Sequence, residues 1–179
     1  MNIQIISDIH GNAKSLENTL NTPYKVDAYI LLGDYLNHGP RNPILDEYDP
    51  IKVSKLLNKI DKPIISVRGN CDSEVDQMLL EFPMMQDESY FLNENILIYI
   101  THGHLFDPQE DYKKKKAKIY MSGHTHIAHI TKINDSIIYN PGSISLPKGS
   151  IASTYGMIQD NELQICDVQT HEIIERIQI

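Results

Sequence analysis

The sequence has little cysteine and no long apolar run. Cys71 and Cys166 are the only cysteines among its 179 residues, and so few thiols are typical of a protein from a reducing cytoplasm. No apolar stretch approaches the length that spans a membrane, and strand-like sequence begins directly after Met1. We therefore expect a cytoplasmic protein with no signal peptide and no membrane anchor.

Positive charge is also scarce. The chain has 16 Lys and Arg against 24 Asp and Glu, which gives a net charge of −8 and a pI near 5.4. This balance argues against a broad nucleic-acid-binding surface. It does not exclude small phosphate compounds, because bound metal ions can reverse the sign of the charge at a site. A run of four lysines at 113–116 fits a solvated loop or helix face, or a contact for an acidic partner.

Length and composition indicate one domain, residues 1–179. The apolar share of 41% and the charged share of 22% are ordinary for a globular protein of this size. The first third alternates apolar runs with helical patterns, which predicts parallel strands joined by right-handed crossovers. Strands are expected at 2–7, 27–33 and 63–67, and helices at 13–20 and 50–60, the second with Asp49 as its N-cap and Pro50 as its first residue.

A third helix is expected from Ser73, and short strands dominate after Pro83. Four apolar side chains of this helix are expected to face the core: Val75, Met78, Leu79 and Phe82. The expected strands lie at 89–92, 96–101, 118–122, 129–133, 136–140, 154–159, 162–168 and 172–178. The whole pattern predicts an α/β protein, a two-sheet sandwich with helices outside.

One apolar run, 28–32, ends at Gly33 and is followed at once by Asp34. It is typical of a buried strand whose carboxyl end carries the aspartate, which is where open α/β sheets hold their sites. Alone, an aspartate there is as often a turn residue or a helix cap. Four further apolar runs end in the same way, in Asp, Asn or His beside a glycine, at 6–12, 67–72, 100–104 and 121–126. Five such clusters converging on one edge of a sheet predict a polynuclear metal site.

Seven side chains of these clusters are candidate metal ligands: Asp8, His10, Asp34, Asn70, His102, His124 and His126. Carboxylate, amide and imidazole ligands suit Mn²⁺, Fe or Zn²⁺ better than Ca²⁺ or a sulfur-bound structural zinc. The Asp-x-His and His-x-His spacings aim both side chains at one point only where the backbone departs from a regular strand or the pair runs along one face. Seven ligands are too many for one ion and fit two, with Asp34 bridging. Two ions about 3.5–4 Å apart can bind a phosphoryl group and supply hydroxide as the nucleophile.

The clusters resemble the five-block signature of the calcineurin-like metallophosphoesterases. The matching segments are Asp8-Ile9-His10, Gly33-Asp34, Gly69-Asn70-Cys71-Asp72, His102-Gly103-His104 and Gly123-His124-Thr125-His126, in the order of that family. Segments 36–42, 68–80, 101–106 and 140–143 also resemble the small bacterial YfcE-type phosphodiesterases. With them the resemblance extends over nearly the full length.

The resemblance implies an α/β/β/α sandwich of two mixed β-sheets that holds a binuclear centre. The ligands it implies are Asp8, His10 and His126 for the first metal, Asn70, His102 and His124 for the second, and Asp34 as the bridge. Mn²⁺ is the metal usually associated with this subgroup, and Fe or Zn²⁺ is the alternative.

Cys71 departs from the family pattern. Many members have histidine after the Gly-Asn pair, as a proton donor to the leaving group or a substrate contact, whereas here Asn70 is followed by Cys71. A thiol with a pKa of about 8.5 is a poor acid for that step and carries no positive charge at neutral pH. We therefore expect good turnover only for leaving groups that need little protonation, such as aryl phosphates.

Three further residues are catalytic candidates, each with a structural alternative. His38 stands where phosphoprotein phosphatases have arginine, which counts against that class, and it is a candidate for the missing acid. Arg41 is a candidate phosphate contact or a loop salt bridge. His104 is a candidate substrate contact or a surface turn histidine. Asp72 is expected either to orient a histidine or to cap the helix that follows it.

These residues predict a binuclear metal-dependent phosphoric diester hydrolase that acts on a small phosphodiester and prefers aryl-type leaving groups. A phosphomonoesterase or cyclic-nucleotide hydrolase is one alternative, and the latter is disfavoured because its alkoxide leaving group needs a proton that Cys71 supplies poorly. A non-catalytic interaction module is the other, as in a retromer subunit of the same fold with an impaired metal site. It is disfavoured because all seven ligand positions are filled. The sequence is also compatible with a homodimer.

Overall fold

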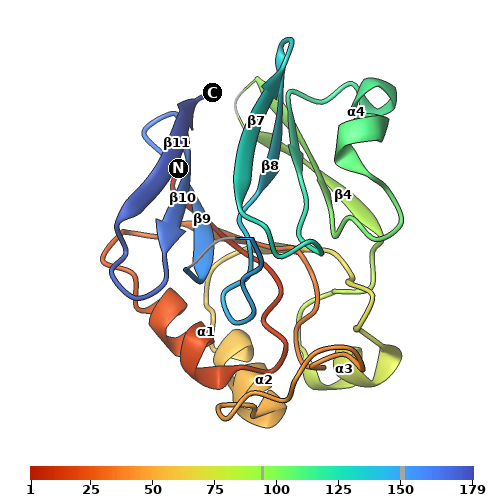
Figure 1. The fold of residues 1–179 in the computed structure, drawn as a ribbon, viewed down its shortest axis with the longest axis vertical. Helices are drawn as coiled ribbons and strands as arrows, with labels where there is room; N and C mark the ends of the chain where they lie inside the picture. The colour runs from red at the N-terminus through yellow and green to blue at the C-terminus, as the bar shows by residue number, and fades with distance from the viewer. Residues whose placement is uncertain (94, 150–151) are drawn as a thin grey trace.

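Two β-sheets pack face to face in the computed structural model, which describes residues 1–93, 95–149 and 152–179 (Figure 1). Within these residues, the first sheet has six strands in the order β11-β10-β9-β1-β2-β3, and the second has five in the order β4-β5-β6-β8-β7. The strands of the first sheet are β1 (Ile3–Ile6), β2 (Ala28–Leu31), β3 (Ile64–Ser66), β9 (Thr154–Gln159), β10 (Glu162–Asp167) and β11 (Ile173–Gln178). Those of the second are β4 (Glu88–Asn93), β5 (Ile96–Thr101), β6 (Ile119–Met121), β7 (His129–Ile133) and β8 (Ser136–Asn140). The helices are α1 (Ala13–Leu20), α2 (Pro50–Asn58), α3 (Glu74–Leu79) and α4 (Pro108–Lys115).

Both sheets are mixed, as the sequence predicts. In the first, β1, β2 and β3 are parallel, with Ile5 beside Ile30 and Ile30 beside Ile65, while β9, β10 and β11 pair antiparallel. In the second, β5, β6 and β8 are parallel, and β4 and β7 pair antiparallel with β5 and β8. Each sheet therefore brings the carboxyl ends of its parallel strands to one edge.

Side-chain alternation along the strands divides the core into layers. Ile5 and Ile30 of the first sheet meet Ile100 and Met121 of the second between the two sheets. The outer face of the first sheet packs against α1 and α2, through residues such as Leu16. The outer face of the second sheet, at Tyr99, Tyr120 and Ile138, packs against Tyr112 of α4. This arrangement is the α/β/β/α sandwich, and it explains why β1 and β2 are mainly apolar: both of their faces are buried, and Gln4 of β1 is a buried amide side chain among the apolar ones.

Helix α2 begins as predicted. The Asp49 carboxylate accepts a hydrogen bond from the Lys52 backbone N–H at 2.8 Å, and Pro50 is the first helical residue. The helix ends at Asn58, two residues before the expected end at Ile60, and most strand limits agree with the prediction within one residue. No helix in the described part of the chain is long and apolar enough to cross a lipid bilayer.

The prediction for α3 is wrong in its packing. Val75, Met78 and Leu79 are 66%, 83% and 40% exposed, and the helix buries no residue. It is a short helix of six residues that begins at the capping box between Ser73 and Asp76. The segment that follows the helix fills the core instead. The residues that do so are Leu80 and Met84, which are buried, and Phe82, which is partly buried.

Helix α4 was not expected as a separate element. It contains the lysines at 113–115 of the four-lysine run, so that part of the run lies on a helix. Lys115 forms an ion pair with Glu88 of β4 at 2.5 Å, and its ammonium group lies 5.0 Å from the centre of the Tyr99 ring. That lysine therefore fastens α4 to the second sheet.

Candidate metal centre

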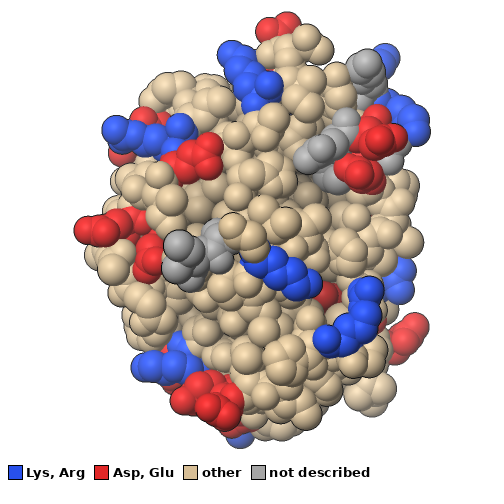
Figure 2. All heavy atoms as spheres, viewed as in Figure 1, with Lys and Arg blue, Asp and Glu red and all other residues tan. Residues whose placement is uncertain are grey.

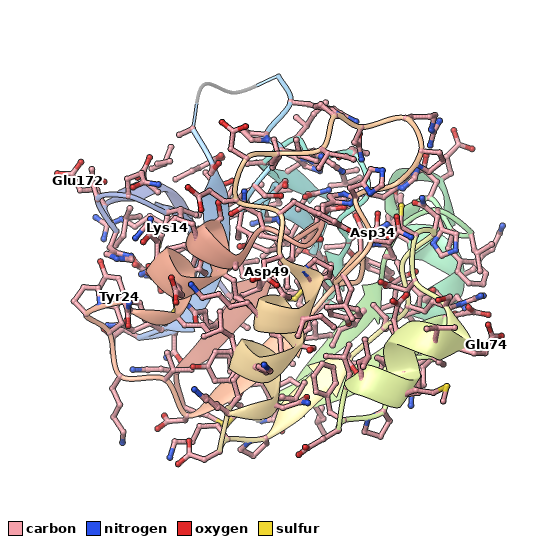
Figure 3. All side chains as sticks on the ribbon, turned by 90° about the horizontal axis from the view of Figure 1, so that it is seen from below. Lys14, Tyr24, Asp34, Asp49, Glu74 and Glu172 are labelled. Atoms are coloured by element: carbon pink, nitrogen blue, oxygen red, sulfur yellow. The ribbon has the colours of Figure 1, made fainter. Side chains whose placement is uncertain are left out.

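The five polar clusters lie at strand ends of both sheets, and not on one edge of a single sheet as the sequence suggested. Three of them follow β1, β2 and β3 of the first sheet, and two follow β5 and β6 of the second. Backbone hydrogen bonds join neighbouring clusters, from Asp8 N–H to Gly33 O at 3.1 Å and from Gly123 N–H to His102 O at 2.9 Å. The clusters meet because the two sheets pack with these carboxyl ends on the same side, and Asp34 marks the place in Figure 3.

The backbone of the ligand clusters departs from regular strand geometry. Five of the seven candidate ligands have positive φ values: Asp8 at 54°, His10 at 48°, Asp34 at 57°, His124 at 66° and His126 at 61°. Asp and His tolerate this left-handed region better than most side chains, and such residues gather at functional sites. The sharp turns let both members of Asp8-x-His10 and of His124-x-His126 aim inward, as their spacing requires.

Two glycines allow the strand ends to approach closely. A Cβ added to Gly69 would lie 2.5 Å from the Asp34 backbone nitrogen, and one added to Gly33 would lie 2.5 Å from the Gly69 nitrogen. Gly33 also has a φ of +97°, which side chains rarely adopt. These glycines therefore place Asp34 beside the cluster that carries Asn70.

Asp8, His10 and His126 form one group of converging side chains. The Asp8 Oδ1 and His126 Nε2 atoms are 3.2 Å apart, and so are the His10 and His126 Nε2 atoms. All three side chains are buried. Their ligand atoms lie within 4.8 Å of one another, which is the spacing of residues that share a metal ion.

Asn70, His102 and His124 form a second group. The Asn70 Oδ1 atom lies 3.3 Å from His102 Nε2, and the rings of His102 and His124 are 5.2 Å apart between centres. The Asp34 Oδ2 atom lies between the groups, 3.6 Å from His10 Nε2 and 3.5 Å from His102 Nε2. Asp34 therefore lies between the two groups, and its role as a bridging ligand stays a prediction.

The histidine tautomers fit a metal centre. His10, His102 and His126 each direct Nδ1 at a backbone carbonyl oxygen, which can only accept, so Nδ1 carries the proton and Nε2 presents its lone pair to the site. The acceptors are Asn37 O at 3.0 Å, Leu32 O at 2.6 Å and Leu146 O at 2.7 Å. The lone pairs of His10 and His126 then face each other, and the buried Asp8 Oδ1 has no hydrogen-bond partner among the described residues. Bound cations would satisfy all of these atoms.

The buried carboxylates also control the protonation of the metal-free site. Burial lowers the pKa of His102, but the hydrogen bond to Asp34 and the charge of Asp8 outweigh it and raise the pKa to about 9. Burial raises the pKa of Asp34, yet the His102 hydrogen bond and charge prevail and hold it well below its usual range. In the metal-free site His102 therefore carries a proton on Nε2 as well as on Nδ1, which offsets part of the carboxylate charge. A metal ion bound there would displace the Nε2 proton and free the lone pair.

Asp72 has neither of the roles expected for it. Its carboxylate accepts backbone N–H bonds from Asp34 and Gly69 at 2.7 Å each and from Tyr35 at 2.8 Å, and Ser73 is the N-cap of α3. Burial and the charge of Asp34 raise the pKa of Asp72 to about 7. Asp72 thus holds the backbone of the bridging candidate rather than a histidine or a helix end.

A pocket of about 820 Å³ opens over the two groups. Arg41, Asn70 and Cys71 line it together with Asp34 and several of the histidines. The Cys71 backbone N–H donates to Asp34 Oδ1 at 2.8 Å, and its sulfur lies within 4.8 Å of ligand atoms of His10 and Asp34. Three of the catalytic candidates therefore share one pocket with the metal ligands.

His38 and His104 lie outside the lining of this pocket. The His38 ring packs edge-on against the Tyr48 ring, 5.4 Å away between centres. The His104 ring lies 5.3 Å from His102 and 6.2 Å from His124, on the side of the second group. Among the described residues, Nδ1 of each has no hydrogen-bond partner. A role for either in proton transfer or substrate binding stays a prediction.

The sequence predicted a turn at 140–143 with its backbone near the site, but not the role of the longer loop at 141–149, which we call the serine loop. The hydroxyls of Ser143 and Ser145 donate to Asp8 O at 2.8 and 3.0 Å. Leu146 O accepts from His126 Nδ1, and the Lys148 N–H donates to His126 O at 3.0 Å. The loop therefore fixes both ends of the first ligand group, and the Asn-Pro-Gly-Ser segment at 140–143 was its signal in the sequence.

Comparison with known proteins agrees with this fold. A family model described as the calcineurin-like phosphoesterase superfamily domain matches residues 1–162. The chain belongs to this superfamily. It is 39% identical to phosphodiesterase YfcE of Escherichia coli over all of this chain and 98% of that protein, and the solved E. coli phosphoesterase structure matches it with a TM-score of 0.94 at 38% identity over 100% of both chains.

More distant relatives share the fold. The probable metallophosphoesterase YsnB of Bacillus subtilis is 30% identical, over 88% of this chain and 83% of that protein. The structure of vacuolar protein sorting 29 from Cryptosporidium parvum superimposes with a TM-score of 0.69 at 16% identity, over 99% of this chain and 98% of that one. At that identity the likeness shows the fold alone.

Proposed function

We propose that this superfamily member is a metal-dependent phosphodiesterase with two divalent ions, most simply Mn²⁺, at the described centre. The single observation that carries the proposal is the position of Asp34 Oδ2 between His10 Nε2 and His102 Nε2. The ligands of the first ion would be Asp8, His10 and His126, those of the second Asn70, His102 and His124, and Asp34 would join them. The full-length similarity to a protein named as a phosphodiesterase supports a diester substrate.

When bound, such ions would lower the pKa of a water molecule between them and offset the charge on the phosphoryl oxygens. The residues of the chain set up the rest of the reaction. Asn37 O, Leu32 O and Leu146 O hold the imidazoles in the required tautomer. Arg41 lines the pocket and, in this proposal, contacts an oxygen of the phosphodiester.

Cys71 determines which leaving groups the site accepts. Burial, followed by the charge of Asp34, raises the pKa of its thiol to about 12. A thiol that holds its proton so tightly is a weak acid toward a departing alkoxide, whose own stability requires protonation. Aryl leaving groups depart as stable phenolates, so the proposed enzyme prefers them.

The experiment is hydrolysis of an aryl phosphodiester and of the matching aryl monoester by metal-stripped protein, with Mn²⁺ then added back. We expect no turnover without metal, restored diester hydrolysis with Mn²⁺, and a higher kcat/KM for the diester. Faster monoester hydrolysis would instead identify a phosphomonoesterase. Absence of turnover on both substrates with metal bound would favour the non-catalytic interaction module.

The charge of the chain bears on the size of the proposed substrate. We expect a small phosphodiester rather than a nucleic acid polymer as substrate, because the net charge is −8. On the face drawn in Figure 2, lysine and arginine alternate with acidic residues, and no continuous basic band crosses it. The cytoplasmic location and a homodimer stay predictions.

A further inference from the structure

Two cationic side chains, Arg41 and Lys148, line the pocket over the two ligand groups, and neither forms an ion pair with a described carboxylate. The other two arginines of the chain are paired, Arg68 with Asp87 at 2.6 Å and Arg176 with Glu162 at 3.4 Å. In a chain with 24 acidic and 16 basic residues, acidic partners are plentiful. Several exposed lysines, such as Lys14, also have no ion pair among the described contacts, but Arg41 and Lys148 differ from them because both line the same pocket. Two such cations in one pocket favour an anionic ligand there.

Hydrogen bonds to the candidate ligand His126 hold the backbone at Lys148 beside the pocket. Its backbone N–H donates to His126 O at 3.0 Å, and two residues earlier Leu146 O accepts from His126 Nδ1 at 2.7 Å. These bonds fasten the end of the serine loop to a candidate metal ligand, so the Lys148 backbone has a defined place beside the first group. Its side chain lines the pocket and is solvent-exposed, which leaves the ammonium group available to a ligand.

The positive charge of the proposed metal-loaded pocket is larger than is needed to offset the single negative charge of a phosphodiester. Asp34 is the only acidic side chain among the lining residues that the structure describes, and the proposed function assigns it to the metals. A phosphodiester carries a single negative charge, which the metals and Arg41 already offset. The volume of about 820 Å³ leaves room beyond the phosphoryl group, and Lys148 adds one more positive charge there.

We infer that Lys148 determines specificity by binding a second anionic group on the substrate. This inference rests on the proposed phosphodiesterase function. The substrate class is a phosphodiester whose non-leaving arm carries a carboxylate or a phosphate. Lys148 binds that group while the metals hold the phosphodiester, so the second charge fixes the orientation of the substrate and lowers its KM.

Two synthetic diesters test this inference. Both have a 4-nitrophenyl leaving arm, and their other arm is a benzyl group with either a carboxylate or the uncharged carboxamide at the far position. For the Mn²⁺-loaded protein we expect a KM about two- to fivefold lower for the carboxylate, the range of an exposed ion pair, and a smaller difference at high salt. In the Lys148→Ala variant the ratio of the two KM values falls toward one, and Lys148→Arg restores it in part.

Lys14→Ala is the matched control. Lys14 is an exposed lysine on α1 and does not line the pocket, and Figure 3 shows it well apart from Asp34. The Lys14→Ala variant removes the same unit of charge from the protein as Lys148→Ala does, but at a place away from the pocket. Its KM ratio should therefore stay at the wild-type value. Bound Mn²⁺ is counted in every variant, to show that the metal centre is intact.

Each outcome bears on a different claim. If the wild-type protein cleaves both diesters with equal KM, or if Lys148→Ala keeps the preference, the inference about Lys148 is wrong while the phosphodiesterase proposal stands. If neither diester is cleaved, the phosphodiesterase proposal fails. Calorimetric binding of the carboxylate diester to the wild-type and Lys148→Ala proteins then decides the inference separately, since equal affinities would overturn it.

Discussion

Five of the seven candidate ligands share an unusual backbone conformation. Asp8, His10, Asp34, His124 and His126 have φ values between 48° and 66°, a region that costs free energy for residues other than glycine. Asn70 and His102 reach the site from ordinary conformations and are not among the residues with positive φ. Four of the five belong to the Asp-x-His and His-x-His pairs, whose two side chains must turn toward one point. Positive φ values also occur away from the site, in turns and connections such as those at Asn134, Asp160 and Asn161.

Replacement of Cys71 tests the account of the leaving group. Cys71→His should raise kcat/KM about tenfold or more on diesters with alkyl leaving groups, because an imidazolium can donate the proton that the thiol retains. Aryl diesters should gain little, since phenolates depart without help. The measurement is kcat/KM for an alkyl and an aryl diester with Mn²⁺ present.

Cys71→Ser is the control for that change, because it keeps a small polar side chain without adding an acid. A Cys71→His protein that gains nothing on alkyl diesters, relative to Cys71→Ser, would show that protonation of the leaving group does not limit the reaction.

At the scale of elements, the strands were more predictable than the helices. Strands β1 and β2 were predictable because both of their faces are buried and their sequences are therefore mainly apolar, with Gln4 the exception in β1. Helix α4 was missed because its sequence, residues 108–115, is polar on all sides and offers no apolar stripe. The apolar spacing of α3 predicted a helix but not its environment, and Leu80 and Met84 took the core positions instead.

Some residues of the candidate site were predictable from the sequence and others were not. Its ligands were recognisable because Asp and His at strand ends form local patterns. Asp72 and the serine loop were not understood from the sequence, because their contacts join residues far apart in the chain, such as Ser143 and Asp8. A hydroxyl or carboxylate that holds a distant backbone group leaves no periodic signal.

The glycine beside the bridging candidate offers a test at this scale. In Gly69→Ala the new Cβ would press on the backbone nitrogen of Asp34 at 2.5 Å and on its carboxylate. We expect Mn²⁺ affinity to fall about ten- to a hundredfold, as it does when a group that orients a ligand is disturbed. The measurement is calorimetric titration of metal-stripped protein.

Asn134→Ala is the matched control. Asn134 has a φ of +55°, so alanine is strained there, but it is exposed in the turn between β7 and β8 and belongs to neither ligand group. This variant should lose some stability and keep its Mn²⁺ affinity. Equal affinity in both variants would contradict the view that Gly69 positions Asp34.

For the whole molecule, the sandwich explains how a chain of net charge −8 could bind a phosphate compound, as the proposed function requires. Two sheets bring their strand ends together, and the buried Asp8 and Asp34 lie where they would bind the proposed cations at one place. The unpaired side chains of Arg41 and Lys148 extend the positive charge into the pocket. The negative charge elsewhere then has little influence on the site, since salt screens it over a distance of about 10 Å.

The central claim is that the strand ends of both sheets form one binuclear centre, and counting bound ions tests it most directly. Metal-stripped protein is dialysed against Mn²⁺ and the bound metal is measured per chain. We predict two ions per chain, with binding that tightens as the pH rises toward 9, because the pKa of His102 in the metal-free site is raised to about 9 and the metal must displace its proton. One ion or none bound to the folded chain would contradict the account.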